Sequence, residues 1–124
     1  MANRLEAALA ASGYRFAHYG WSSAPDGDYG VFGEDRGDDF VAGDRHVERG
    51  TSCFVALYTR DDGPTPRRKV EEALNTLRCP WRLNAVIYER DSGYIHFEWI
   101  VRILGELWEP DPETGGDDNA ESQD

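Results

Sequence analysis

The clearest pattern of apolar and polar residues lies near the C-terminal end of the chain. From residue 95 to residue 103 every second side chain is large and apolar: Ile95, Phe97, Trp99, Val101 and Ile103. Such alternation predicts a strand with one buried face, since a shift of one residue would expose all five groups. The preceding run alternates as Leu83, Ala85, Ile87 and Glu89 against Asn84, Val86, Tyr88 and Arg90. With Asp91-Ser92-Gly93 as a turn whose glycine takes a positive φ, residues 83–103 are predicted to form a β-hairpin.

A long strand is predicted to begin near Phe40 and to end at Thr59. Its second half, residues 53–58, is apolar on both faces, as expected for a strand in the middle of a sheet. Residues 47–51 are polar on both faces. That part of the strand is therefore expected to protrude past the core or to pair outside it.

Two helices are predicted, one at the N-terminus and one after the long strand. Residues 3–12 are rich in alanine with apolar groups at helical spacing, and Gly13 is a natural C-terminal stop. The second helix is expected to begin with Thr65 as N-cap and Pro66 at the first helical position. Its apolar stripe is the strongest helical signal in the chain and consists of Val70, Ala73, Leu74 and Leu77.

Two short strands are predicted between the first helix and the long strand. Residues 14–21 alternate, residues 22–28 have the composition of a turn, and residues 29–34 form a second run weakened by its glycines. The two runs are interpreted as a hairpin. A polar loop follows, over residues 34–39.

Taken together, these elements predict an α+β fold with an antiparallel or mixed sheet and both helices packed on one face. A single domain is expected over residues 1–105, followed by an acidic, disordered tail over residues 106–124. The role of Leu107 and Trp108, which follow the last strand, has two interpretations. They complete the core, which is the simpler interpretation, or they present an exposed aromatic anchor to a partner.

The net charge of −11 is spread unevenly and bears on the choice of partners. Residues 106–124 hold eight acidic residues and no basic ones, whereas residues 1–105 hold 16 acidic and 13 basic residues. An acidic chain is a poor match for the phosphates of DNA or RNA, so no specific nucleic-acid binding is expected. The sequence has no apolar run long enough for a membrane helix, so no membrane partner is expected either.

Candidate chemistry is sparse, and the sequence predicts neither an enzyme nor a cofactor. Cys53 and Cys79 are interpreted as buried, reduced thiols, because the chain lacks the paired spacing of metal or redox cysteines. The acids between Glu34 and Asp44 do not match a calcium loop. An enzyme remains a third alternative, and it would require a deep pocket where Glu89, His96 or Asp44 converge.

Several stretches resemble one protein family when they are taken in order. They are Asp28-Tyr29-Gly30-Val31-Phe32, Ala42-Gly43-Asp44-Arg45, Val55-Ala56-Leu57-Tyr58-Thr59, Lys69-Val70-Glu71-Glu72-Ala73-Leu74, Trp81 and Tyr88-Glu89-Arg90-Asp91-Ser92-Gly93-Tyr94. The main part of this order, residues 40–103, resembles the tail-completion or tail-terminator-like (tail-to-head joining) proteins of long-tailed phages. The family often has Ala-Asp-x-Lys where this chain has Ala-Gly-Asp-Arg.

The resemblance implies a structural subunit of the virion. Such a subunit forms a ring with copies of itself, expected to be a hexamer, at the head-proximal end of the tail. The ring caps the tail-tube protein and joins it to the head-connector protein, after assembly in the host cytoplasm. The alternative is another neck or connector protein, or a non-viral adaptor domain for protein interactions.

Contacts between subunits are expected from the polar loop and the strand that follows it. These residues are poor core material, and two arginines among them are suited to pairing with acids of an adjacent subunit. The candidate contact residues are Asp38, Asp39, Phe40, Asp44, Arg45 and Arg49.

Overall fold

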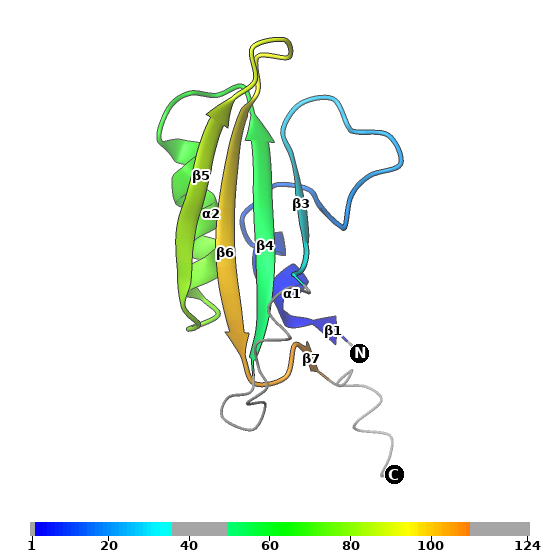
Figure 1. Cartoon of the computed structure of the whole chain (residues 1–124), viewed down its shortest axis with the longest axis vertical. Coiled ribbons are helices and arrows are strands. Elements are labelled where there is room, and N and C mark those ends of the chain that lie inside the picture. The colour runs from blue at the N-terminus through cyan, green and yellow to red at the C-terminus, as the bar shows by residue number, and fades with distance from the viewer. Residues whose placement is uncertain (1, 36–49, 110–124) are drawn as a thin grey trace.

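The structure is a computed structural model that describes residues 2–35 and 50–109. A five-stranded sheet in the order β2-β3-β4-β6-β5 forms its centre, and β1 pairs separately with β7 (Figure 1). The elements are β1 (Ala2–Asn3), α1 (Arg4–Ala10), β2 (Phe16–His18), β3 (Tyr29–Glu34), β4 (Gly50–Thr59), α2 (Thr65–Asn75), β5 (Trp81–Tyr88), β6 (Ile95–Leu104) and β7 (Trp108–Glu109). Two helices with a mixed sheet confirm the α+β class.

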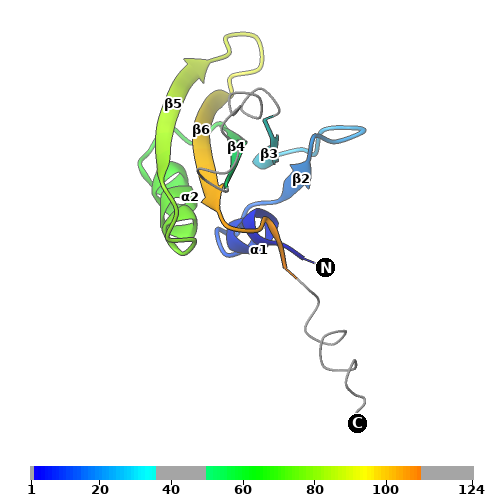
Figure 2. The same cartoon turned by 60° about the horizontal axis from the view of Figure 1, so that its bottom comes forward.

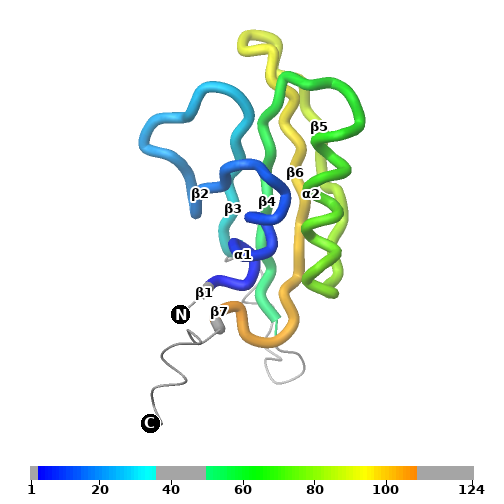
Figure 3. The backbone as a smooth tube through the Cα atoms, turned by 180° about the vertical axis from the view of Figure 1, so that it is seen from behind, coloured from blue at the N-terminus to red at the C-terminus, as the bar shows by residue number. Residues whose placement is uncertain are grey.

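Both helices lie on the same side of the sheet (Figures 2 and 3). Helix α1 lies beneath the β2–β3 half, and α2 runs along β6 and β5. In the described part of the chain no helix covers the opposite face. The molecule therefore has a closed side that holds the core and an open side made of strand side chains.

Strand β4 is the middle strand of the sheet and pairs antiparallel with both β3 and β6. Its inward side chains Cys53, Val55 and Leu57 are fully buried. Opposite them in register lie Val101, Trp99 and Phe97 of β6, as the alternation predicted. Leu5 and Leu9 of α1 and Val70 and Leu74 of α2 close this core from the helix side. The doubly apolar stretch of residues 53–58 is thereby confirmed as a central strand.

The helices form where they were predicted, with small differences at their ends. Asn3 caps α1, because its Oδ1 accepts hydrogen bonds from the N–H groups of Leu5 and Glu6 at 2.8 and 3.1 Å. Helix α1 ends at Ala10, and Gly13 takes a φ of +88°. Thr65 is not the N-cap of α2, because the cap is Pro64, whose carbonyl accepts from Arg68 N–H at 3.1 Å.

The hairpin of β5 and β6 is confirmed, with Gly93 at a φ of +79° in its turn. A β-bulge at Asn84 breaks the alternation of β5, however. The predicted division of β5 into two faces, with Leu83, Ala85 and Ile87 on one face and Val86 and Tyr88 on the other, is therefore wrong. Leu83 pairs with Trp99 and Val86 pairs with Phe97, which puts both on the helix side. Ile87 pairs with His96 on the open side. An extra residue in one strand changes the face of every residue beyond it.

The predicted hairpin over residues 14–34 is wrong, because β2 pairs with β3 in parallel. The connection over residues 19–28 carries the chain back to the start of β3 and uses positive φ at Tyr19, Gly20 and Gly27. Phe16 packs its ring over Gly30, where a Cβ would collide with the ring. A side chain at position 30 would exclude this arrangement. The strand pattern is weaker for having a glycine at this position, but only a glycine leaves room for the Phe16 ring.

The packed structure extends past the expected boundary at residue 105. Leu107 is 8% exposed and belongs to the core, and its carbonyl accepts a hydrogen bond from Arg4 N–H at 2.9 Å. The next two residues form β7 against β1. Trp108 remains 43% exposed. Of the two alternatives for this pair, completion of the core holds for Leu107, and the chain is folded at least as far as Glu109.

Candidate functional site

The six predicted contact residues fall in a part of the chain that the structure does not describe. Asp38, Asp39, Phe40, Asp44, Arg45 and Arg49 all lie between residues 35 and 50. Their role in subunit contacts stays a prediction. Candidate surfaces are therefore sought on the sheet and the helices.

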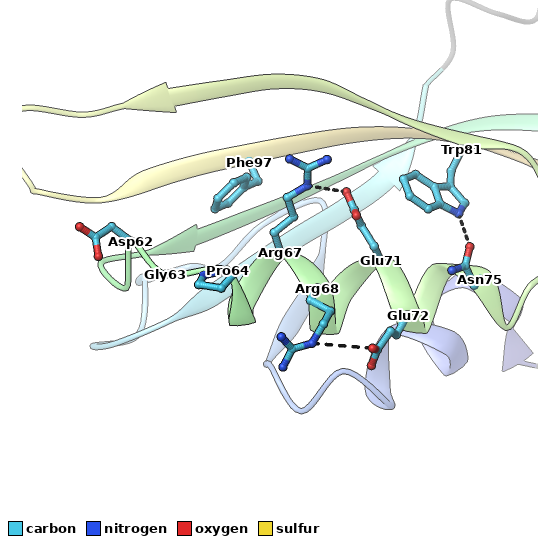
Figure 4. A pocket seen from close by; sticks show the side chains of 10 residues that line it. All are labelled: Asp62, Gly63, Pro64, Arg67, Arg68, Glu71, Glu72, Asn75, Trp81 and Phe97. Atoms are coloured by element: carbon cyan, nitrogen blue, oxygen red, sulfur yellow. Dashed lines mark hydrogen bonds and ion pairs between the residues drawn. The ribbon is translucent and has the colours of Figure 1, made fainter.

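A groove of about 750 Å³ lies between α2 and the β5 edge of the sheet (Figure 4). Phe97 and Trp81 face it from the sheet, and Arg67 and Glu71 face it from the helix. Arg67 Nε donates to Glu71 Oε2 at 2.8 Å, and Trp81 Nε1 donates to Asn75 Oδ1 at 2.8 Å. The groove thus has an aromatic floor and a wall of charged groups held by their own contacts.

Strand β5 carries a strip of exposed apolar residues along this edge. Val86, Ile87 and Tyr88 expose 52%, 47% and 64% of their surface. Val86 and Tyr88 lie on the helix side, where they pair with Phe97 and Ile95 of β6. Ile87 lies on the open side. An edge strand that is apolar on both faces has the pattern of a strand that is covered by a neighbour.

The opposite edge, β2, presents a different group of side chains. Glu34 Oε1 accepts a hydrogen bond from the Tyr19 hydroxyl at 3.0 Å. The other carboxylate oxygen, Oε2, lies 2.9 Å from His18 Nε2. The ring of His18 stacks between Tyr19, at 4.3 Å, and Phe32, at 4.9 Å. Tyr19 is 59% exposed and has a φ of +66°, which is uncommon for a residue with a side chain. Its hydrogen bond to Glu34 is the main reason that the pKa of Tyr19 is raised.

These two edges of the sheet differ in charge. Residues 16–35, which form β2, β3 and their connection, hold four acidic residues and neither lysine nor arginine. The acids are Asp26, Asp28, Glu34 and Asp35. Residues 65–88, which form α2 and β5, hold five basic residues against Glu71 and Glu72. The bases are Arg67, Arg68, Lys69, Arg78 and Arg82.

The open face of the sheet carries a row of rings. Tyr29 of β3 stacks on Tyr58 of β4 at 4.8 Å, and Tyr58 stacks on His96 of β6 at 4.4 Å. Burial raises the pKa of Tyr58, and the nearby Tyr29, Glu89 and Glu98 raise it further. Ile87 is the cross-strand neighbour of His96, so the row runs on to the β5 edge. On the helix side of the sheet, Val86 of the strip is the cross-strand neighbour of Phe97, which lines the groove.

No family model, curated protein or solved structure matches this chain. Within residues 2–35 and 50–109, no three or more His, Cys, Asp and Glu side chains are arranged to hold a metal ion. No helix in these ranges is long and apolar enough to cross a membrane. Cys53 is fully buried, and burial raises its thiol pKa to about 12, which makes it a poor nucleophile.

The residues named for a catalytic pocket do not line the groove. Its lining includes neither Glu89 nor His96, and Asp44 lies outside the described ranges. His96 is engaged with Tyr58, and Glu89 accepts from the Ser92 hydroxyl at 3.2 Å. The apolar run at 86–88 is visible in the sequence, but the run alone does not distinguish a buried strand from an exposed edge, and nothing in the sequence pointed to Tyr19 as an exposed ring.

Proposed function

We propose that this protein is a structural subunit that works by assembling with other proteins, and more narrowly a tail-completion subunit of a long-tailed phage. In this role it forms a ring, expected to be a hexamer, at the head-proximal end of the tail. The ring caps the tail-tube protein and joins it to the head connector. The observation that carries the proposal is the exposed apolar strip Val86–Ile87–Tyr88 on an edge strand.

An unprotected edge of this kind favours assembly over catalysis. Sheet edges on monomeric proteins usually carry charges, proline or a bulge that prevents pairing with another chain. Here the bulge at Asn84 lies before the strip, and the three residues of the strip are uncharged and between 47% and 64% exposed. Burying them against another subunit would contribute about 25 cal/mol for each Å² of apolar surface removed from water.

The order of elements supports the narrower role. Four of the stretches that resemble tail-completion proteins are the end of β4, part of α2, Trp81 and the turn between β5 and β6. Of the other two, Asp28–Phe32 runs into β3, and Ala42–Arg45 lies outside the described residues. The described stretches follow one another along the chain in the order that the resemblance requires.

Electron microscopy tests the proposal with the protein alone and mixed with the tail-tube protein encoded beside it. Rings with a central channel, or tubes that stop at a fixed length with a cap, are the expected result. Ile87→Lys should abolish them, and Leu104→Lys is the matched control because Leu104 is also an apolar strand residue, 44% exposed. A protein that never engages the tube under any condition would sink the tail-completion role.

A second candidate is another neck or connector protein, or an adaptor domain of non-viral origin. The same exposed edge favours it, because any strand-adding partner would use such a surface. It becomes the preferred function if the tube experiment fails while Ile87→Lys still abolishes binding to some other defined partner.

A further inference from the structure

We propose that the acidic C-terminal segment of this chain, residues 110–124, docks in a basic recess on the open face of the sheet. The recess has a volume of about 180 Å³ and lies between the start of β5 and the end of β6. The proposal goes beyond the assembly role and does not depend on it. It gives the recess a ligand from the same chain, which an acidic partner would have to displace.

Two arginines and no acidic residue line this recess. Arg82 of β5 and Arg102 of β6 are its charged residues, and Pro80, Trp81 and Ile100 complete the lining. Arg82 pairs in register with Ile100, whose side chain is on the open side. The backbone N–H of Arg102 donates to the Pro80 carbonyl at 2.9 Å. The two arginines therefore lie on neighbouring strands, on either side of an apolar floor.

The charge of Arg82 is not balanced by a carboxylate in the described part of the chain. Its side chain is exposed, and its Nη1 donates to the neutral amide oxygen of Asn84 at 2.8 Å. None of the ion pairs among the described residues includes it. Glu98, the acid on the open side of β6, lies opposite Ala85, across the bulge from Arg82. A guanidinium has five N–H donors, so Arg82 has donors left for an incoming carboxylate.

The C-terminal segment has the complementary charge. Residues 110–124 hold six acidic residues and no basic one. The internal segment outside the described ranges, residues 36–49, holds four acidic residues and three arginines, so its own charges nearly balance. Attraction to two arginines grows with the excess of carboxylates that a segment carries. Charge therefore favours residues 110–124 as the occupant of the recess.

The segment also leaves the fold near the recess. Figure 1 shows that β5 begins and β6 ends at the end of the sheet where β7 lies. The 15 residues after Glu109 can span up to about 50 Å, whereas five strands spaced about 4.8 Å apart extend over about 19 Å. The tether is thus long enough, and it keeps the acids at a millimolar effective concentration around the recess. That concentration matters because a single exposed ion pair is weak on its own.

Paramagnetic relaxation in NMR spectra of the full chain tests the proposal. Asn119→Cys places a nitroxide label in the segment without removing an acid. The native Cys53 and Cys79 are buried and should not take the label. The amide signals of residues 81–82 and 100–102 should be broadened by the label, and those of the turn at the other end of the hairpin should not.

Two substitutions of the same kind provide a matched comparison. Arg82→Gln removes the exposed charge of the recess, so the broadening should be lost. Arg90→Gln removes an exposed arginine from the turn at the opposite end of the same hairpin, so the broadening should remain. Both variants change the net charge equally, and a difference between them therefore reports the site. Salt at about 1 M, where the Debye length is about 3 Å, should also remove the broadening.

Four results would overturn the proposal. The broadening is absent or spread evenly over the surface, or it survives Arg82→Gln. It appears only when an isotope-labelled chain without the nitroxide is mixed with a nitroxide-labelled chain, which would assign the recess to the segment of a second copy. Deletion of residues 110–124 leaves the signals of residues 81–82 and 100–102 unshifted, which would mean that the recess does not hold the segment.

Discussion

The indole Nε1 of Trp99 donates a hydrogen bond of 2.9 Å to Oε2 of Glu71. Trp99 is fully buried at the centre of β6, and Glu71 lies on α2. The same carboxylate oxygen accepts from Arg67 Nε at 2.8 Å. The bond therefore fixes both the helix and the charged wall of the groove relative to the core of the sheet.

Glu71→Ala should lower the free energy of unfolding by about 1–3 kcal/mol, because it leaves the buried indole N–H without its acceptor. Urea unfolding followed by fluorescence measures the change. Glu72→Ala is the control, since Glu72 is 68% exposed and faces Arg68 at 3.8 Å. Its effect should stay within about 0.5 kcal/mol. Equal losses from both substitutions would contradict the role given to the Trp99 bond.

Gly30→Ala should lower the free energy of unfolding by about 1–3 kcal/mol, because its Cβ would meet the ring of Phe16. The substitution can be placed in a Phe16→Ala background, where the ring is gone. There it should cost much less, and the two substitutions should show a clear coupling energy in a double-mutant cycle. Strictly additive losses would show that the ring does not lie over Gly30.

Leu107→Ala should lower the free energy of unfolding by about 2–5 kcal/mol, as for other leucines in a core. Leu107 is 8% exposed, whereas Leu104 is 44% exposed, so Leu104→Ala should cost far less. Thermal or urea unfolding of the two variants measures the difference. If Leu107→Ala is as mild as its control, the fold ends near residue 105 as the sequence indicated.

Cys53 should resist thiol reagents in the folded protein and react only on unfolding. Burial raises its pKa from 9.0 to about 12, so the reactive thiolate is scarce at neutral pH. Labelling at increasing urea, with the modified position found by peptide mapping, measures this. Fast labelling of Cys53 without urea would contradict the burial.

The same pKa predicts how stability changes in alkaline solution. Above about pH 9 the thiol ionises in the unfolded chain but stays protonated in the folded one until about pH 12. The unfolded state then binds fewer protons, so the contribution of Cys53 to the free energy of unfolding falls as pH rises through this window. Cys53→Ala should show a smaller fall over the same range than the wild type does.

The sequence predicted best where one face of an element is buried along its whole length. Strand β6 and helix α2 have continuous apolar faces, and both appear with the expected sides in the core. Strand β5 was misassigned beyond Leu83, because a single bulge shifts the alternation and leaves no mark in the residue types. The parallel pairing of β2 with β3 was also missed. A turn-like composition shows that the chain changes direction, but it does not show whether the next strand runs parallel or antiparallel to the previous one.

The candidate site was only partly accessible from the sequence. The contact residues expected between Asp38 and Arg49 remain predictions, because they lie outside the described residues. A run such as Val86–Tyr88 is equally compatible with burial in a core or with exposure at an edge. Only the position of a strand in the sheet decides between these.

By itself, the sequence determined the α+β class, the core faces of α2 and β6, and the central position of β4. These follow from local periodicity, because burial on one face requires apolar residues at a fixed spacing. The tertiary structure decided that β2 and β5 form the two edges, that Leu107 joins the core, and that Tyr19 and the 86–88 strip remain exposed. Those features depend on which distant segments lie beside each other, and periodicity along the chain carries no information about that.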